Sequence, residues 1–227
     1  MISKLYNYFG LWSKVLPLLE LKKVLTILDR EYKLKNICPK KDYVFKAFKL
    51  CPLEDLKVVF LGLDPYPQKD IATGILFGNS RDTPENMLSP SLRIIRDAAL
   101  DLSIPKYGYS FDITLESWAK QGILMLNSAL TVEMNKIGSH SSIWRPFISS
   151  LLMNLSKSET GIIYVLFGEQ AATFAPYINQ NFNTIIKVKH PSYYARIGKD
   201  MPSDMFKRVS DLCREKYGTS IKWFTYN

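Results

Sequence analysis

The sequence has few of the residues that build metal centres and disulfide bridges. Its 227 residues include two histidines and three cysteines, Cys38, Cys51 and Cys213. An odd number of cysteines without the spacing of metal ligands predicts reduced thiols, as in a cytosol-like compartment. With two histidines in the chain, a histidine-rich metal site is not expected. The sequence therefore predicts neither a disulfide framework nor a metal centre.

Long hydrophobic runs are also missing. No segment reaches 18 consecutive apolar residues, so we expect no membrane span. The first residues lack the long apolar stretch and small-residue cleavage site of a signal peptide. We therefore expect a protein that is not secreted and that works in the cytoplasm or nucleus.

Acidic residues are scarce relative to basic ones. The chain has 30 lysines and arginines against 21 acidic residues, a net charge of +9. Such an excess favours a polyanionic partner, most simply nucleic acid. The alternative explanation is that the charge serves solubility alone. Hydrophobic residues make up 47% of the chain and charged residues 22%, as in ordinary globular proteins. The length suits one compact α/β domain that spans residues 1–227.

Short apolar runs alternate with longer segments of helical periodicity. The runs are rich in β-branched and large apolar residues and end at polar or glycine positions, which predicts buried parallel strands with both faces covered. The expected strands are Lys57–Leu63, Ile123–Leu126, Gly161–Phe167 and Thr184–Lys189. The expected helices include Leu16–Leu34, Pro90–Leu102 and Ile143–Leu155. Residues 1–36 form a helical lead-in or N-terminal extension, which serves either packing or partner docking.

Polar residues follow each expected strand at its carboxyl end. In open α/β sheets these ends meet at one edge, where ligands bind. The residues concerned are Asp64, Asn127, Glu169 and His190. A carboxylate, a carboxamide and an imidazole can together read a planar heterocycle and stabilise charge beside it. The same set also suits acyl transfer or a generic hydrolase.

Three sequence blocks narrow this choice. They are Gly62–Tyr66 (GLDPY), Trp118–Asn127 (WAKQGILMLN) and His190–Ser192 (HPS), in that order. These blocks resemble the signature blocks of family 1 uracil-DNA glycosylases, and weaker similarity extends from Ile37 to the C-terminus. The first block continues to Pro67, and the resulting Asp-Pro-Tyr-Pro variant resembles the poxvirus branch of the family.

The resemblance implies a fold and an activity. The fold is a single α/β domain with a central four-stranded parallel sheet flanked by helices. The activity is to flip uracil out of single- or double-stranded DNA and hydrolyse its N-glycosidic bond, as in base excision repair. The resemblance implies no cofactor or metal and a monomeric protein. A protein inhibitor or a replication partner is a further candidate partner.

The resemblance assigns catalysis to Asp64 and His190. Asp64 would stabilise positive charge on the sugar and orient or activate the attacking water. His190 would act as a neutral donor to the uracil oxygen that gains charge. The simpler interpretations are a turn aspartate in an Asp-Pro pair and a buried or phosphate-binding histidine.

Four residues are expected to bind the base. Asn127 would pair with the ring N–H and adjacent carbonyl of uracil, an edge on which cytosine has the opposite pattern. Phe77 would stack on the base, and Tyr66 would exclude the thymine methyl group. Leu63 replaces a glutamine of the family and would act through its backbone. The alternatives are a strand-end cap for Asn127 and core packing for the two aromatic residues.

A third group of residues is expected to contact the DNA. Ser89 and Ser91 offer hydroxyl and backbone N–H groups where a helix begins, although Ser89 also suits plain N-capping. Tyr194 takes the place of the leucine that wedges into the duplex in the family. Further contacts are expected from Ser192, Tyr193 and Arg196.

Two further positions depart from the family pattern. Pro67 replaces a histidine, and Glu169 replaces a serine that meets phosphate. These changes put the rate and the affinity for DNA in doubt more than the reaction. Two alternatives therefore stay open. One is a catalytically weak uracil-DNA reader or a scaffold for replication processivity, and the other is a glycosylase for another base.

Overall fold

The computed structural model describes residues 2–100 and 108–226, and its centre is a four-stranded parallel sheet. The strand order is β4-β2-β6-β7, and neighbouring strands pair in parallel. Their bounds are β2 Val58–Gly62, β4 Ile123–Asn127, β6 Ile163–Phe167 and β7 Thr184–Val188. All four expected strands are therefore confirmed, with ends that differ by one or two residues.

Burial differs between the strands. Every residue of β2, β4 and β6 is buried, as expected for strands covered on both faces. The expectation is wrong for β7, in which Ile186 is the one buried residue. Edge position alone does not explain this, because β4 lies at the other edge of the sheet and is fully buried. The sequence of β7 differs in that it contains Thr184 and the exposed Lys187.

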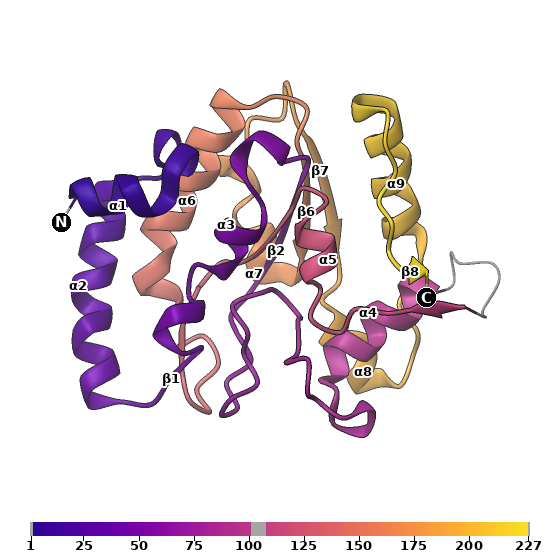
Figure 1. Cartoon of the computed structure of the whole chain (residues 1–227), viewed down its shortest axis with the longest axis horizontal. Helices are drawn as coiled ribbons and strands as arrows, with labels where there is room; N and C mark the ends of the chain where they lie inside the picture. The colour runs from indigo at the N-terminus through magenta and orange to yellow at the C-terminus, as the bar shows by residue number, and fades with distance from the viewer. Residues whose placement is uncertain (1, 101–107, 227) are drawn as a thin grey trace.

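Helices flank the sheet, and Figure 1 shows α2 and α6 on one side and α9 on the other. The expected helix Pro90–Leu102 corresponds to α4, and its predicted last two residues lie outside the described residues. The helix expected over Ile143–Leu155 is longer at both ends. The helices are α1 Ile2–Phe9, α2 Leu18–Leu34, α3 Lys46–Leu50, α4 Pro90–Leu100, α5 Glu116–Ala119, α6 Ser141–Ser158, α7 Gly168–Ala172, α8 Pro191–Ile197 and α9 Asp204–Tyr217.

Short elements connect these layers. Two antiparallel pairs join β1 Ile37–Cys38 to β5 Val132–Glu133 and β3 Tyr109–Ser110 to β8 Thr225–Tyr226. The 3₁₀ turns are η1 Gly10–Lys14, η2 Lys41–Tyr43, η3 Leu53–Asp55, η4 Glu85–Met87 and η5 Ala175–Tyr177. Within residues 2–100 and 108–226, every helix is too short or too polar to span a membrane.

The N-terminal helices pack against the body of the protein. Helix α2 lies along α6 and buries Leu21, Val24 and Leu28 in the shared hydrophobic core. The indole N–H of Trp12 donates a hydrogen bond of 2.9 Å to the carbonyl oxygen of Cys51. Apolar contacts and a buried hydrogen bond therefore hold this segment in place.

The strand order places a switch point at β2. The chain passes from β2 to β4 on one side and then returns to β6 on the other side of β2. In open parallel sheets a crevice forms at the carboxyl ends of the strands where the order reverses in this way. The residues that follow β2 therefore lie where a ligand site is expected.

Candidate active site

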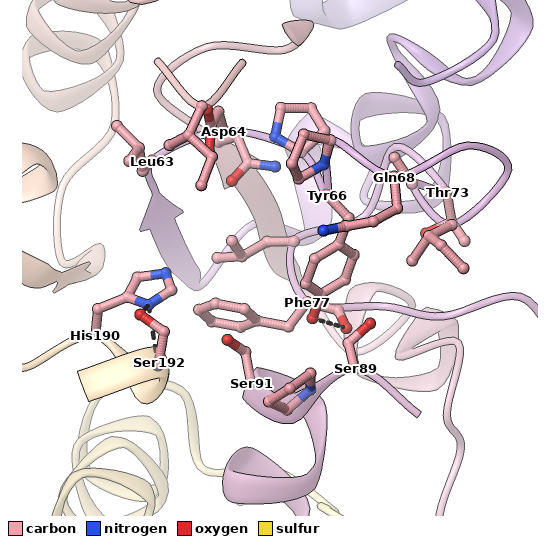
Figure 2. Close-up of a pocket in the computed structure, with 18 of the residues that line it drawn as sticks. Leu63, Asp64, Tyr66, Gln68, Thr73, Phe77, Ser89, Ser91, His190 and Ser192 are labelled. Carbon is pink, nitrogen blue, oxygen red and sulfur yellow. Dashed lines mark hydrogen bonds between the residues drawn. The ribbon is translucent and has the colours of Figure 1, made fainter. Parts of the chain in front are cut away.

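A cavity of about 660 Å³ lies at the carboxyl ends of the sheet strands. Each of the four strands contributes to its wall, through Asp64 after β2, Asn127 in β4, Glu169 after β6 and His190 after β7. The expected convergence of the strand ends is thus present. Other predicted residues that line the cavity, most of them labelled in Figure 2, are Leu63, Tyr66, Phe77, Ser89, Ser91 and Ser192.

The carboxylate of Asp64 is held by the backbone of a distant loop. The backbone N–H of Gly138 donates a hydrogen bond of 2.6 Å to Asp64 Oδ2. Burial raises the pKa of the Asp64 carboxyl, and the Gly138 hydrogen bond opposes this shift in part. A partly buried carboxylate with a raised pKa accepts a proton more readily than an exposed one, which suits a general base.

The imidazole of His190 is fixed by the start of α8. Ser192 directs its backbone N–H at Nδ1 at 3.2 Å, and its hydroxyl lies 2.8 Å from the same nitrogen. Because a backbone N–H can only donate, Nδ1 is an acceptor and the proton of the neutral ring lies on Nε2. Figure 2 shows Nε2 on the side of the ring that faces away from Ser192.

The electrostatic environment keeps this imidazole neutral. Burial, with a smaller contribution from the positive charge of Arg196, lowers the pKa of His190 to about 4. At neutral pH the ring therefore presents an N–H donor without a positive charge. The geometry supplies the neutral donor that the sequence resemblance implied.

Asn127 lies in a space that Gly62 leaves open. The two residues are register partners on β4 and β2. A Cβ atom on Gly62 would clash with the ends of the Leu76 and Asn127 side chains, so a larger residue here would force them to move. Asn127 is 7% exposed, and its Oδ1 has no hydrogen-bond partner in the described part of the chain. An unpaired buried acceptor is costly, and a ligand N–H donor would relieve that cost.

Two aromatic residues form another part of the wall. Phe77 has a φ of 63°, a left-handed conformation that is uncommon for a bulky residue and typical of functional sites. Its ring makes edge contacts with Phe167 and His190, with centroids 5.1 and 5.4 Å away. The hydroxyl of Tyr66 donates a hydrogen bond of 3.1 Å to the carbonyl oxygen of Phe77. The two residues therefore hold each other in position beside the cavity.

The serines at the start of α4 differ in what they offer. Asn79 Nδ2 donates to Ser89 Oγ at 3.0 Å, and the Ser89 backbone N–H donates to Asn79 Oδ1 at 3.2 Å. The prediction that Ser89 offers its backbone N–H to a phosphate is therefore wrong, because a buried asparagine occupies it. Ser91 is also buried, and its hydroxyl points toward the ring of Phe77 in Figure 2.

The residues of α8 do not line the cavity as a group. Tyr194 packs in part against the hydrophobic core, which weakens the prediction that it wedges into a duplex. Tyr193 lies beside Lys189, whose ammonium is 4.3 Å from the ring centroid, and Arg196 is exposed. Ser192 lines the cavity, but both of its donors are directed at His190 rather than outward.

Comparison with known proteins identifies the family. A family model described as the uracil DNA glycosylase superfamily matches residues 48–212. The chain belongs to this superfamily. The uracil-DNA glycosylase of Campylobacter jejuni subsp. jejuni (strain 81-176) is 41% identical over 190 residues, 82% of this chain and 79% of the relative. That of Mesomycoplasma hyopneumoniae (strain 7448) is 32% identical over 204 residues, 89% and 90% of the two chains.

Solved structures agree with the family and the fold. The crystal structure of mimivirus uracil-DNA glycosylase is 25% identical and matches with a TM-score of 0.76, covering 89% of this chain and 80% of that chain. A structure of the Nitratifractor salsuginis protein, 23% identical, matches in fold with a TM-score of 0.68 over 93% and 96% of the two chains. The predicted α/β fold and family resemblance are therefore confirmed.

Two departures from the glycosylase pattern now have a structural setting. Pro67 is buried, and its carbonyl oxygen accepts a hydrogen bond of 3.0 Å from the backbone N–H of Asn135. Glu169 is exposed in the first turn of α7 and lines the cavity. A carboxylate at this edge of the cavity would repel a phosphate group bound close to it.

Several cavity residues of this glycosylase-family site escaped the sequence analysis. Gln68 and Thr73 lie on the loop after β2 and appear in Figure 2 beside Tyr66. Met87 and Ile137 are apolar yet 65% and 70% exposed at the edge of the cavity. Proximity to the first block was a signal for Gln68 and Thr73, whereas nothing local marks Met87 or Ile137. Among the described residues, no group of three or more His, Cys, Asp or Glu side chains is placed to hold a metal ion.

Proposed function

We propose that the chain hydrolyses the N-glycosidic bond of deoxyuridine in DNA, releasing free uracil and leaving an abasic site. Membership of the uracil DNA glycosylase superfamily and relatives of that name at 32–41% identity support this activity. The observation that carries the proposal is the cavity wall itself. It combines a partly buried carboxylate at Asp64, an unpaired carboxamide oxygen at Asn127 and a neutral N–H donor at His190.

The reaction balances with these groups alone. The bond between sugar C1′ and uracil N1 breaks, and its electron pair leaves with the base as a uracil anion. The Nε2–H of His190 donates to the uracil oxygen that carries this charge. Water adds to C1′, and Asp64 accepts the proton that the water loses. Asp64 then gives up this proton to solvent and the uracil anion takes one up, which restores the carboxylate and leaves neutral uracil. The carboxylate also stabilises the positive charge that builds on the sugar before water attacks.

Selection of uracil rests on hydrogen bonding and shape. Asn127 offers an acceptor and a donor that match the N3–H and O4 of uracil, whereas cytosine leaves both unpaired. Phe77 stacks on the base, and Tyr66 blocks the space that the methyl group of thymine would need. The base reaches these groups by flipping out of the stack, because the bond is inaccessible within it.

A DNA substrate agrees with the charge of the chain, and further partners can be proposed. The net charge of +9 favours binding to the phosphate backbone. A protein inhibitor is a candidate partner, supported by the mimivirus relative that crystallised in complex with UGI. The poxvirus-like form of the first block, a replication partner and the monomeric state stay predictions.

A cleavage assay on defined variants tests the proposal. A labelled strand with one uracil is incubated with protein in the presence of a chelator, and abasic sites are then cut with alkali. We expect cutting at uracil and not in matched thymine or cytosine strands. Asp64→Asn and His190→Gln should each lower the single-turnover rate by about 10²- to 10³-fold, as for lost general bases and charge-stabilising donors. Asp211→Asn, an exposed change on α9, is the matched control and should cut normally.

The outcomes separate the proposed enzyme from its alternatives. A folded wild-type protein that binds the uracil strand without cutting it supports a catalytically weak reader or scaffold, and attention then turns to Pro67 and Glu169. Cutting at a different base, with no cutting at uracil, supports a glycosylase of different specificity. Full activity in both catalytic variants contradicts the assigned roles of Asp64 and His190.

A further inference from the structure

A second cavity lies beside the candidate active site, and the proposed reaction does not use it. It measures about 420 Å³ and is lined by the end of α2, by β1 and η2, and by the loop after β2. Lys69 and Ala72 line both cavities, so the two adjoin one another. Its volume falls within the range of small-ligand sites.

The lining of this second cavity is basic. It includes four lysines and one aspartate. Lys35 and Lys41 are engaged with carboxylates on α2, at nitrogen–oxygen distances of 2.7 and 3.4 Å. These two lysines are therefore partly neutralised by the protein itself.

The other two lysines are better placed to meet a ligand. Lys40 pairs with Asp70 at 3.0 Å, and both side chains are more than half exposed, so water screens this pair. Lys69 has no ion pair within the described part of the chain and lies where the two cavities meet. A phosphate at this junction would compete with Asp70 for Lys40, whose ion pair with Asp70 is weakened by solvent, and would give Lys69 a charged partner.

An aromatic surface accompanies these charges. Tyr43 lines the second cavity and is 43% exposed, although a tyrosine is more often covered by other side chains. Tyr32 is turned inward, because its hydroxyl donates a hydrogen bond of 2.6 Å to the carbonyl oxygen of Pro39. Positive charge next to an exposed aromatic ring is the combination that binds unpaired nucleotides.

We propose that the second cavity is a nucleotide subsite for the DNA strand that carries the uracil. Lys40 and Lys69 hold a phosphate near the junction of the cavities, and Tyr43 stacks on the base of a nucleotide close to the flipped uracil. The inference rests on the proposed function. It predicts that strands long enough to reach this cavity bind more tightly than a minimal uracil oligonucleotide, and that single strands, whose bases are free to unstack, gain most.

Two pairs of lysine substitutions test the subsite. The double variant Lys40→Ala/Lys69→Ala removes both proposed phosphate ligands, and both side chains are exposed. The matched control is Lys120→Ala/Lys157→Ala. These exposed lysines precede β4 and β6, at the opposite edge of the sheet, and their loss changes the net charge equally.

The first readout is binding, measured by fluorescence anisotropy with a uracil-free single strand of about fifteen nucleotides. Loss of one held phosphate should lower the slope of log affinity against log salt by about 0.7 in the Lys40/Lys69 variant. Tyr43→Ala should weaken binding at least about fivefold, as for one lost stacking contact, whereas Tyr43→Phe keeps the ring and the affinity. The slope of log affinity against log salt should stay steeper in the Lys120/Lys157 control variant than in the Lys40/Lys69 variant.

The second readout is cleavage of a long and a minimal uracil strand. We expect Tyr43→Ala, whose side chain lines the second cavity and not the first, to raise KM for the long strand relative to the control Tyr43→Phe, with kcat unchanged and the minimal strand cut normally. Equal losses on both strands, or losses no larger than in the control, overturn the subsite. Because the anisotropy measurement needs no cleavage, a protein that fails to cut uracil refutes the proposed function without deciding the subsite's affinity for DNA.

Discussion

The neutral state of His190 leads to a prediction about stability and pH. Its pKa is lowered from 6.5 to about 4 in the folded protein, chiefly by burial. The unfolded chain keeps the ordinary value of about 6.5. Between these two pH values the unfolded state therefore binds a proton that the folded state does not. The contribution of His190 to stability is complete above pH 6.5 and is lost as the pH falls toward 4.

The size of this effect follows from the difference between the pKa of His190 in the unfolded chain and in the folded protein. Each pKa unit corresponds to about 1.4 kcal/mol, so the shift is worth about 3 kcal/mol between pH 7 and pH 4. Other groups also titrate in this range, and a comparison with His190→Gln cancels them, since glutamine does not ionise. The wild type should lose about 3 kcal/mol of unfolding free energy relative to the variant over this range.

Two measurements check this reasoning. Urea unfolding at pH 7 and pH 4 gives the free-energy difference between the wild type and His190→Gln. Because the chain has two histidines, NMR of the imidazole nitrogens resolves each ring, and the signal missing in the variant identifies His190. A pH-independent free-energy difference, a titration near 6.5 or a proton on Nδ1 would refute the neutral Nε2–H assignment.

Three further predictions concern other parts of the site. Burial raises the pKa of Asp64, so the cleavage rate should fall with decreasing pH at a midpoint above the ordinary value of 3.8. Asp64→Asn should remove this acidic limb from the pH–rate profile of its residual activity, and an unaltered limb assigns the titration to another group. Gly62→Ala places a Cβ against the side chains of Leu76 and Asn127, and urea unfolding should reveal a loss of about 1–3 kcal/mol of unfolding free energy. Wild-type stability of the variant speaks against the close packing. Glu169→Gln removes a carboxylate from the edge of the cavity and should tighten DNA binding about two- to fivefold at low salt; weaker binding in a salt titration means that the carboxylate does not oppose the DNA.

The sheet was largely predictable from sequence because its strands are buried runs. Apolar residues fill β2, β4 and β6, and glycine or polar residues end each run close to where pairing stops. The partial exposure of β7 was missed, although Thr184 and Lys187 make this strand more polar than the central strand β2. Position at the edge depends on the order in which strands pair, which local composition does not record.

Only those parts of the site that topology and sequence motifs determine were predictable. The rule for parallel sheets brings Asp64, Asn127 and His190 to one edge, and the structure agrees. The exchange of hydrogen bonds between Asn79 and Ser89 depends on a loop ten residues away, which no motif marks. The second cavity joins the segment around Tyr43 to the loop at Lys69, so it exists only in the folded chain.

The central claim is that the cavity at the carboxyl ends of the strands binds uracil through Asn127 and His190. NMR of the two imidazole rings during titration with free uracil tests it directly. The other histidine, His140, is buried outside this cavity and serves as the internal control. We predict that uracil shifts the signals of the His190 ring and leaves those of the His140 ring unchanged. Thymine and cytosine at equal concentration should have little effect, and Asn127→Ala should abolish the response. Uracil that shifts neither ring at saturation, or that acts equally on the Asn127→Ala variant, would contradict the claim.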